Sequence, residues 1–302
     1  MTHSELERMQ VLGIRYRRTA CAVQDERGLD AYLESGVYES ARIPSEYCEP
    51  RIEPTECSGD AVADLGVFNG RIAETAAAAR RAGAVLLMTG GDCSHATGIV
   101  GGLQDAHGPG LRLGLVWFDA HGDFNTPHTS TSGMLGGMPV AVCAGLAHPA
   151  WREGAHIVAP MPTERILLVD VRNLDPAEET LIRGAGVATA MLSSGSPGVA
   201  LPEAIDRLAQ EVDAIYLHID ADILDARLVP SHGTQEPNGP DVGQTCTAID
   251  RVMATGKVVA LALVSIYNQG EDGRMSVESG VELLRCGLGA CQAHGTAHLP
   301  LV

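Results

Sequence analysis

The chain has 302 residues and a formal net charge of −17, and 45% of its residues are hydrophobic. This hydrophobic content supports a large core, and α/β folds of this length often form one domain, so we expect a single domain over residues 1–302. Such an acidic surface repels phosphate backbones and anionic lipids, which argues against nucleic acid or membranes as partners. The sequence has no apolar run long enough to span a bilayer and no signal-peptide pattern at its start, so we expect a cytoplasmic protein.

Apolar, β-branched runs alternate with helix-like stretches along the chain. The predicted strands cover residues 9–16, 84–88, 111–120, 165–171, 214–222 and 257–266. The predicted helices cover residues 62–83, 203–212, 243–256 and 274–291. This alternation predicts a three-layer α/β/α fold around a mostly parallel sheet that is buried on both faces. Residues from about 17 to 61 are expected to form irregular excursions over the surface.

The eight cysteines are scattered along the chain, and none forms a C-x-x-C pair. This spacing argues against a zinc ribbon and against a disulfide scaffold. Free buried thiols are therefore expected for most of them.

Polar residues collect where predicted strands end, which is where parallel sheets bind ligands. Asp119, His121 and Asp123 alternate in "DAHGD", so an extended backbone places them on one face. Asp220 and Asp222 alternate in the same way in "DAD". These segments offer four carboxylates and one imidazole.

Four neighbouring acids repel one another unless a cation neutralises them. The alternative, that they cap loops or face water, is weakened because two such motifs each end an apolar strand. Carboxylate-rich ligation with one imidazole suits manganese first, with iron, nickel, cobalt or zinc as further choices. Shared carboxylates would allow two ions, with a hydroxide between them as nucleophile.

Three ordered motifs make the sequence similar to the arginase, or ureohydrolase, family: "GGDCSHATG" at 90–98, "DAHGDFNTPHTSTSG" at 119–133 and "DADILD" at 220–225. The resemblance is specific from about residue 84 to 235 and looser over the whole chain. It implies an α/β fold with a central sheet of about eight mostly parallel strands. It also implies a two-manganese centre that hydrolyses guanidino-type C–N bonds, and assembly as a trimer or hexamer.

The resemblance also assigns roles to individual residues. Asp119, His121, Asp123, Asp220 and Asp222 match metal ligands, with Asp119 and Asp220 bridging two ions. Asp123 also matches the acid that hydrogen-bonds the metal-bound hydroxide, so Asp123 and His121 are the expected catalytic residues.

Further positions match the family's substrate-binding residues. The loop that holds an α-carboxylate corresponds to Asn125 and Ser132, and the residues near an α-amino group correspond to Asp175 and Glu178. Thr234 falls at a threonine of the substrate pocket. Each position also has a plain structural reading, because Asn-Thr-Pro favours a turn and Asp-Pro-x-Glu favours a helix start.

The first departure from the family pattern is Cys93, which stands where the family has a metal-binding histidine. A thiolate can bind a metal, although it suits manganese less well than imidazole does. Alternatively, Cys93 is a small buried side chain that does not coordinate. His95 is a substitute ligand only if the segment does not turn helical after Cys93.

Two further departures affect the reacting end of the substrate. Gly136 occupies the position of a proton-relaying histidine, and His128 and His232 lie in nearby loops where histidines are commonly solvated. The strand at 257–266 is followed by Tyr267, with no acid before Glu271 where the family has a guanidinium-binding glutamate. A free guanidinium would therefore lack a charge-assisted partner.

The expected activity is metal-dependent hydrolysis of a guanidino C–N bond in an arginine-like amino acid. The departures favour N-hydroxy-arginine, which would give ornithine and hydroxyurea. Arginine itself, another guanidino or amidino compound, and a catalytically silent metal-binding homologue are the alternatives.

Overall fold

The computed structural model of the chain describes residues 8–192 and 199–302. Within these residues, nine strands form one sheet in the order β4-β1-β5-β11-β10-β6-β7-β8-β9, and all neighbouring strands are parallel. The strands are β1 (Met9–Ile14), β4 (Ser45–Cys48), β5 (Val85–Gly90), β6 (Leu113–Phe118), β7 (Ile166–Val169), β8 (Ala188–Met191), β9 (Val199–Ala200), β10 (Ala214–Asp220) and β11 (Val258–Val264). A short antiparallel hairpin, β2 (Tyr16–Arg17) and β3 (Ala20–Cys21), stands apart from this sheet.

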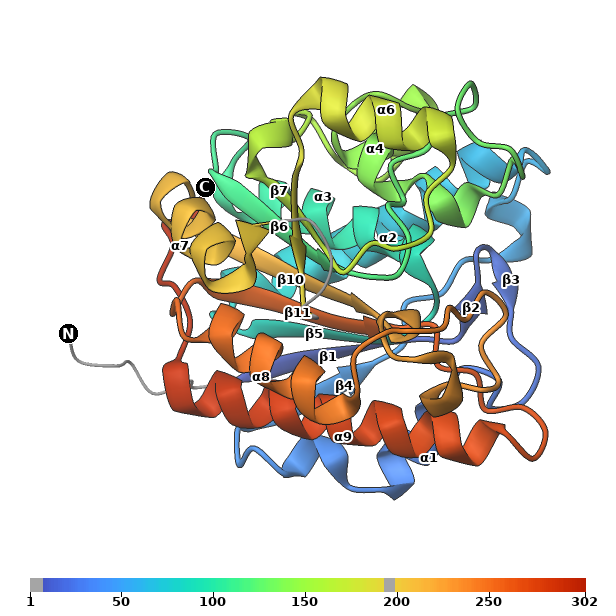
Figure 1. Cartoon of the computed structure of the whole chain (residues 1–302), viewed down its shortest axis with the longest axis vertical. Helices are drawn as coiled ribbons and strands as arrows, with labels where there is room; N and C mark the ends of the chain where they lie inside the picture. The colour runs from blue at the N-terminus through green and yellow to red at the C-terminus, as the bar shows by residue number, and fades with distance from the viewer. Residues whose placement is uncertain (1–7, 193–198) are drawn as a thin grey trace.

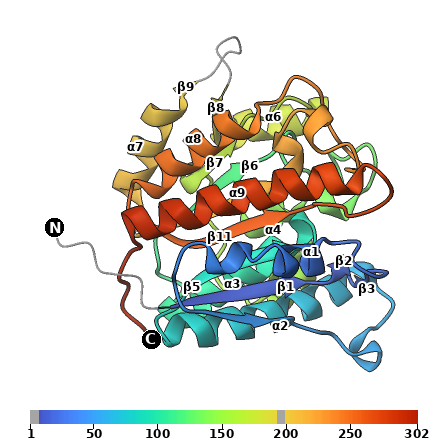
Figure 2. The same cartoon turned by 90° about the horizontal axis from the view of Figure 1, so that it is seen from below.

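Helices cover both faces of the sheet, as Figures 1 and 2 show. The helices are α1 (Leu29–Glu34), α2 (Ala61–Arg81), α3 (Ala96–His107), α4 (Pro139–Cys143), α5 (Pro149–Gly154), α6 (Pro176–Ala185), α7 (Leu201–Glu211), α8 (Val242–Met253) and α9 (Gly273–His294). One hydrophobic core joins the sheet to α2, α3 and α5, and a second joins it to α7, α8 and α9. The result is a three-layer α/β/α architecture, as the sequence predicts.

Each central strand contributes to both cores because successive side chains point to opposite faces. In β6, Leu115 and Trp117 lie in the first core, whereas Val116 and Phe118 lie in the second. All six residues of β6 are buried. This double burial explains why the strands read as continuous apolar runs.

The region from 17 to 61 is more ordered than the sequence suggests, so that expectation is partly wrong. Residues Ser45–Cys48 form β4 and pair in parallel with β1 at the edge of the sheet. Tyr32 and Tyr38 from the same region are buried in the second core. The four residues of β4 are exposed or half-exposed, so their sequence lacks the apolar pattern that predicts a strand.

The cysteines differ from the expectation of mostly free, buried thiols, because two of them form a bridge and three of the free ones are not buried. Cys246 of α8 and Cys286 of α9 form a disulfide. The other six cysteines are free, and three of them, Cys93, Cys143 and Cys291, are buried. Their spacing in sequence could not reveal the bridge, because it depends on how two helices pack.

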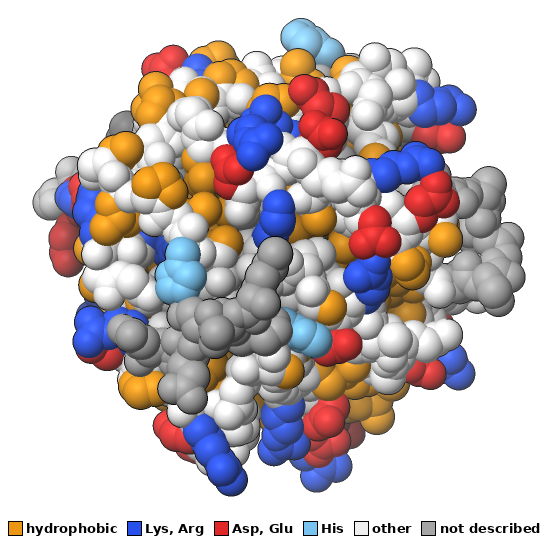
Figure 3. Space-filling model, turned by 90° about the vertical axis from the view of Figure 1, so that its left-hand side faces the viewer, with side chains coloured by type: hydrophobic (Ala, Val, Ile, Leu, Met, Phe, Trp, Pro, Cys, Tyr) orange, Lys and Arg blue, Asp and Glu red, His pale blue; other side chains and the backbone are white. Residues whose placement is uncertain are grey.

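Among the described residues, none of the helices is long and apolar enough to cross a bilayer. Figure 3 shows the left-hand side of Figure 1, where acidic, basic and hydrophobic side chains are interspersed.

Candidate functional site

Four carboxylates and two imidazoles meet at the carboxyl edge of the sheet. They come together because β6 and β10 are neighbouring strands. Phe118 pairs with Ile219, so Asp119, directly after β6, lies beside Asp220, the last residue of β10. Asp119 and Asp220 are both buried. Asp222 follows in a 3₁₀ turn, where its backbone N–H donates to Asp220 Oδ1 at 2.9 Å.

His121 completes one group of metal-binding atoms with Asp119 and Asp222. Its Nδ1 lies 3.3 Å from Asp119 Oδ1 and 3.0 Å from Asp222 Oδ2. Backbone N–H groups hold the two acids, since Ala120 donates to Asp222 and His121 donates to Asp119. These three side chains offer ligand atoms within 4.8 Å of one another.

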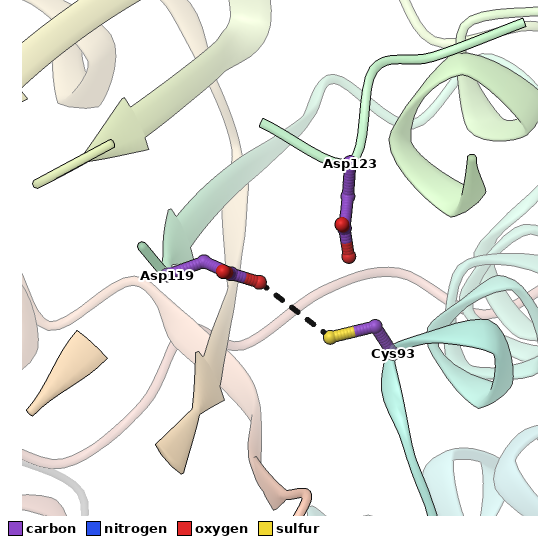
Figure 4. A group of neighbouring side chains, drawn as sticks. All are labelled: Cys93, Asp119 and Asp123. Atoms are coloured by element: carbon purple, nitrogen blue, oxygen red, sulfur yellow. Dashed lines mark hydrogen bonds between the residues drawn. The ribbon is translucent and has the colours of Figure 1, made fainter. Parts of the chain in front are cut away.

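Cys93 enters the same space from the turn that follows β5. Its Sγ lies 2.9 Å from Asp220 Oδ2 and 3.6 Å from Asp119 Oδ2. Figure 4 shows the sulfur directed at the carboxylate of Asp119, with the carboxylate of Asp123 directed into the same space. Cys93, Asp119 and Asp123 thus form a second group of closely spaced ligand atoms.

Asp123 carries two signs of a functional constraint. Its backbone has φ 47°, in the left-handed region that few residues other than glycine adopt. Its Oδ2 is buried and has no hydrogen-bond partner. A strained backbone that presents an unpartnered carboxylate oxygen fits a residue held ready for a cation.

The electrostatics of the cluster show what a cation would relieve. Burial, together with the neighbouring carboxylates, raises the pKa of Asp119 well above its ordinary value. Burial and the charge of Asp220 likewise raise the pKa of Asp123. Burial alone would lower the pKa of His121, but its contacts with Asp119 and Asp222 raise it to about 12. Protons on these side chains relieve the same repulsion that a divalent ion would relieve.

His232 belongs to this cluster, contrary to the expectation of a solvated loop residue. It is buried, and its Nε2 lies 3.2 Å from Asp220 Oδ1 without hydrogen-bond geometry. Its Nδ1 accepts the backbone N–H of Thr234 at 3.1 Å. Burial alone would raise the pKa of Asp220, but the adjacent His232 keeps it below its ordinary value.

The other two histidines considered from sequence do not reach the cluster. Residues Cys93–His95 form a 3₁₀ turn, and the Nδ1 of His95 accepts the backbone N–H of Asp92 while its Nε2 faces the carbonyl of Arg18. His128 is exposed and does not line the pocket. Neither replaces the imidazole that the family pattern asks for at Cys93.

The cluster opens into a pocket of about 680 Å³. The predicted substrate-binding residues Asn125, Ser132, Asp175, Glu178 and Thr234 all line it. Gly136, Ser265 and Tyr267 line it as well. The structure therefore brings every residue of the predicted site to one cavity.

Several pocket residues also have structural roles. Asp175 and Glu178 form the capping box at the start of α6, which the alternative reading predicts. Asp175 also accepts hydrogen bonds from Asn125 and from both the backbone and hydroxyl of Thr131, and these bonds lower its pKa. Glu178 is buried and accepts the N–H of Phe124, so it braces the loop that carries Asp123.

The end of the pocket beyond the cluster has an unexpected charge. Ser265 donates to Asp220 Oδ2 at 2.6 Å, and Tyr267 packs edge-on against His232. The guanidinium carbons of Arg27 and Arg17 lie 4.6 and 6.0 Å from the centre of the Tyr267 ring. Two cations therefore lie against this ring, and the carboxylate of Asp92 lines the same pocket.

The sequence prediction missed two aromatic residues, Trp117 and His218, which precede the acids in β6 and β10. Trp117 donates from Nε1 to Asp119 Oδ2 at 3.1 Å, and its ring stacks on His218. Period-two alternation along β6 and β10 was the available signal, because it places residue 117 with 119 and residue 218 with 220.

The donor set fits a divalent metal centre. Buried carboxylates gather with imidazole and sulfur, and one carboxylate oxygen lacks any partner. The parallel sheet and this cluster define an α/β protein with a candidate divalent-metal centre at the carboxyl edge of its sheet.

The sequence of the chain is similar to those of known proteins. The sequence model described as "Arginase family" matches residues 31–289. The arginase of Neurospora crassa is 30% identical over 235 residues, which cover 72% of this chain and 64% of that protein. The arginase of Bacillus caldovelox is 33% identical over 180 residues, which cover 58% of each chain. The chain belongs to the arginase family, and its matched part spans about three fifths of these two relatives.

Solved structures agree on the fold. The arginase of Bacillus cereus superposes with a TM-score of 0.79 at 24% identity, covering 93% of this chain and 98% of that one. The formimidoylglutamase of Bacillus subtilis superposes with a TM-score of 0.69 at 14% identity, covering 97% of this chain and 89% of that one. The fold is thus shared by proteins named for different substrates.

Proposed function

We propose that this protein is a metal-dependent amidinohydrolase that cleaves N-hydroxy-arginine to ornithine and hydroxyurea. The observation that carries the proposal is the asymmetry of its pocket. Loop residues suited to an amino acid line one part, whereas Ser265 and Tyr267 stand where a guanidinium-binding acid would be expected. Family membership supports the class of reaction.

The amino-acid part of the pocket is polar and well held. Asn125 donates to Asp175 and accepts the hydroxyl of Thr129, which fixes its amide. The hydroxyl of Ser132 caps the backbone N–H of Met134. These groups would hold the α-carboxylate and α-amino groups of the substrate.

The reacting part favours a group without full positive charge. The hydroxyl of Ser265 donates its hydrogen bond to Asp220, and two arginines lie against the Tyr267 ring. A cationic guanidinium finds no carboxylate at position 265 or 267, where the family resemblance implies one, and it faces two arginines. An N-hydroxyguanidine is less basic, so it loses less in the same place.

The proposed centre uses Asp119, His121, Asp123, Asp220, Asp222 and Cys93 as ligands. Manganese is the proposed ion, as one or two per chain, and its chemistry when bound is the activation of water for attack on the guanidino carbon. Asp123 would orient the attacking water and carry its proton to the leaving nitrogen, as the bond between that nitrogen and the guanidino carbon breaks. Asp119 and Asp220 hold the centre together from neighbouring strands.

The partners and the location are proposed from family membership and from the acidic composition. We expect a small-molecule substrate, a homo-oligomer that is a trimer or hexamer, and a cytoplasmic location, with no nucleic acid or membrane bound.

Metal quantification beside product assays tests the proposal. Purified protein is analysed for bound metal and then assayed with manganese for hydroxyurea released from N-hydroxy-arginine and urea released from arginine. We expect bound manganese and a higher kcat/KM for N-hydroxy-arginine. Equal or faster turnover of arginine would refute the substrate, and absence of both metal and activity on guanidino compounds would favour a silent homologue.

A further inference from the structure

A pair of stacked rings forms the floor of the metal cluster. Trp117 and His218 are cross-strand partners in the β6–β10 register. Their ring centres lie 3.7 Å apart with planes inclined by 9°. Both residues are fully buried, so the pair has little freedom to move.

His218 joins this floor to Cys93. Its Nε2 lies 3.4 Å from Cys93 Sγ, and its Nδ1 lies 2.9 Å from the hydroxyl of Tyr216. The Tyr216 ring stands edge-on to His218, and both side chains are inaccessible to solvent. Three buried side chains from β10 and the β5 turn therefore form one contact chain that ends at the sulfur.

The acceptors around the Cys93 sulfur determine which side chain donates in each of these contacts. The sulfur of Cys93 also contacts Asp220 Oδ2 at 2.9 Å, and an ionised carboxylate can only accept. Asp220 lies closer to the sulfur than Asp119 does, so the S–H donates to Asp220 and the sulfur is the acceptor towards His218. His218 then carries its proton on Nε2, and Tyr216 donates to Nδ1. This direction satisfies all three contacts.

We propose that His218, held by Trp117 and Tyr216, positions the Cys93 sulfur as a metal ligand by donating a hydrogen bond from Nε2. Metal binding would release the S–H proton to solvent, and an N–H that points at the sulfur would stabilise the resulting thiolate and fix where its remaining lone pairs face. Those lone pairs then face the space shared with Asp119 and Asp123 (Figure 4). His218 is thus a positioning residue that compensates for the missing imidazole at position 93. This inference rests on the proposed metal centre.

Cobalt binding tests the proposal without relying on turnover. A thiolate bound to Co²⁺ gives a near-ultraviolet charge-transfer absorption that oxygen and nitrogen ligands do not give. The full chain is titrated with Co²⁺ while this absorption and the bound metal are both measured. We expect the absorption in the wild type and none in Cys93→Ser.

Substitutions then isolate His218. We expect His218→Gln to shift or weaken the absorption and to lower Co²⁺ affinity about tenfold or more. Tyr216→Phe removes only a hydroxyl, so it should fold normally and show a smaller shift in the same direction. His107→Gln is the matched control, because His107 is a buried histidine whose partners are Arg80 and Pro300.

The outcomes separate this inference from the proposed function. A wild type that binds Co²⁺ and hydrolyses substrate without the absorption would overturn the role of His218 while leaving the function standing. An absorption and affinity unchanged in both His218→Gln and Tyr216→Phe would also overturn it. Failure of the wild type to bind Co²⁺ would overturn the metal centre and this inference together.

Discussion

His232 Nε2 lies 3.2 Å from Asp220 Oδ1 inside the metal cluster, although His232 belongs to a loop. The backbone N–H of Thr234 donates to its Nδ1, which leaves Nε2 as the ring nitrogen beside the carboxylate. His232 is therefore placed to orient a bridging ligand.

Replacing His232 by Ala should weaken Mn²⁺ binding about tenfold to a hundredfold, because Asp220 loses its orienting neighbour. Isothermal titration of the metal-free protein with Mn²⁺ measures this change. His128→Ala is the control, since His128 is exposed and lies outside the pocket. Equal Mn²⁺ affinities in the two variants would show that His232 has no role at the centre.

Cys93→His should raise manganese occupancy, because imidazole is a better ligand for manganese than a thiolate. Metal analysis of protein purified under identical conditions provides the measurement. Cys143→Ala serves as a control for loss of a buried thiol outside the cluster. An occupancy that does not change would place Cys93 outside the coordination sphere.

Ser265→Glu should shift specificity towards arginine by restoring a carboxylate at the reacting end. A charge-assisted hydrogen bond contributes about 1.5–3 kcal/mol, so the ratio of kcat/KM for arginine over N-hydroxy-arginine should rise about tenfold or more. The matched control is Ser265→Gln, which has similar size without charge. If both variants change the ratio equally, charge at this position does not determine specificity.

Stability of the metal-free protein should fall as pH rises from about 7 to 9, above the ordinary pKa of histidine. The folded-state pKa values of Asp119 and Asp123 are raised and that of His121 reaches about 12, so the native state binds more protons than the unfolded state over this range. Manganese takes the place of those protons, so its stabilising effect should grow with pH. Thermal unfolding with and without Mn²⁺ across this range checks both slopes, and a metal-free protein that gains stability with pH would contradict the argument.

Removing the disulfide should destabilise the protein by about 4 kcal/mol, because the bridge between Cys246 and Cys286 closes a loop of 40 residues. Urea unfolding of a Cys246→Ser, Cys286→Ser double variant measures this loss. Cys21→Ser, at an exposed free cysteine, should leave the midpoint unchanged. A midpoint for the double variant equal to that of the wild type would show that the bridge contributes nothing.

Sequence pattern predicted the central strands and the acids that follow them because both depend on local periodicity. "DAHGD" and "DAD" follow β6 and β10, and the register then brings them together. The edge strand β4 escaped prediction because its half-exposed residues lack an apolar pattern. His232 escaped prediction because nothing local distinguishes a buried loop histidine from a solvated one, whereas period-two alternation along β10 was an available signal for His218.

The order of the strands has a consequence for how the centre forms. Its side chains follow β5, β6, β10 and β11, and in the sheet β11 lies between β5 and β10 although it comes last of the four in sequence. Cys93 and Ser265, which both contact Asp220, are separated by more than half of the chain. Closing such long loops is entropically costly and slow, so the cluster should assemble late in folding. Metal uptake during refolding would then report completion of the native topology rather than formation of any local segment.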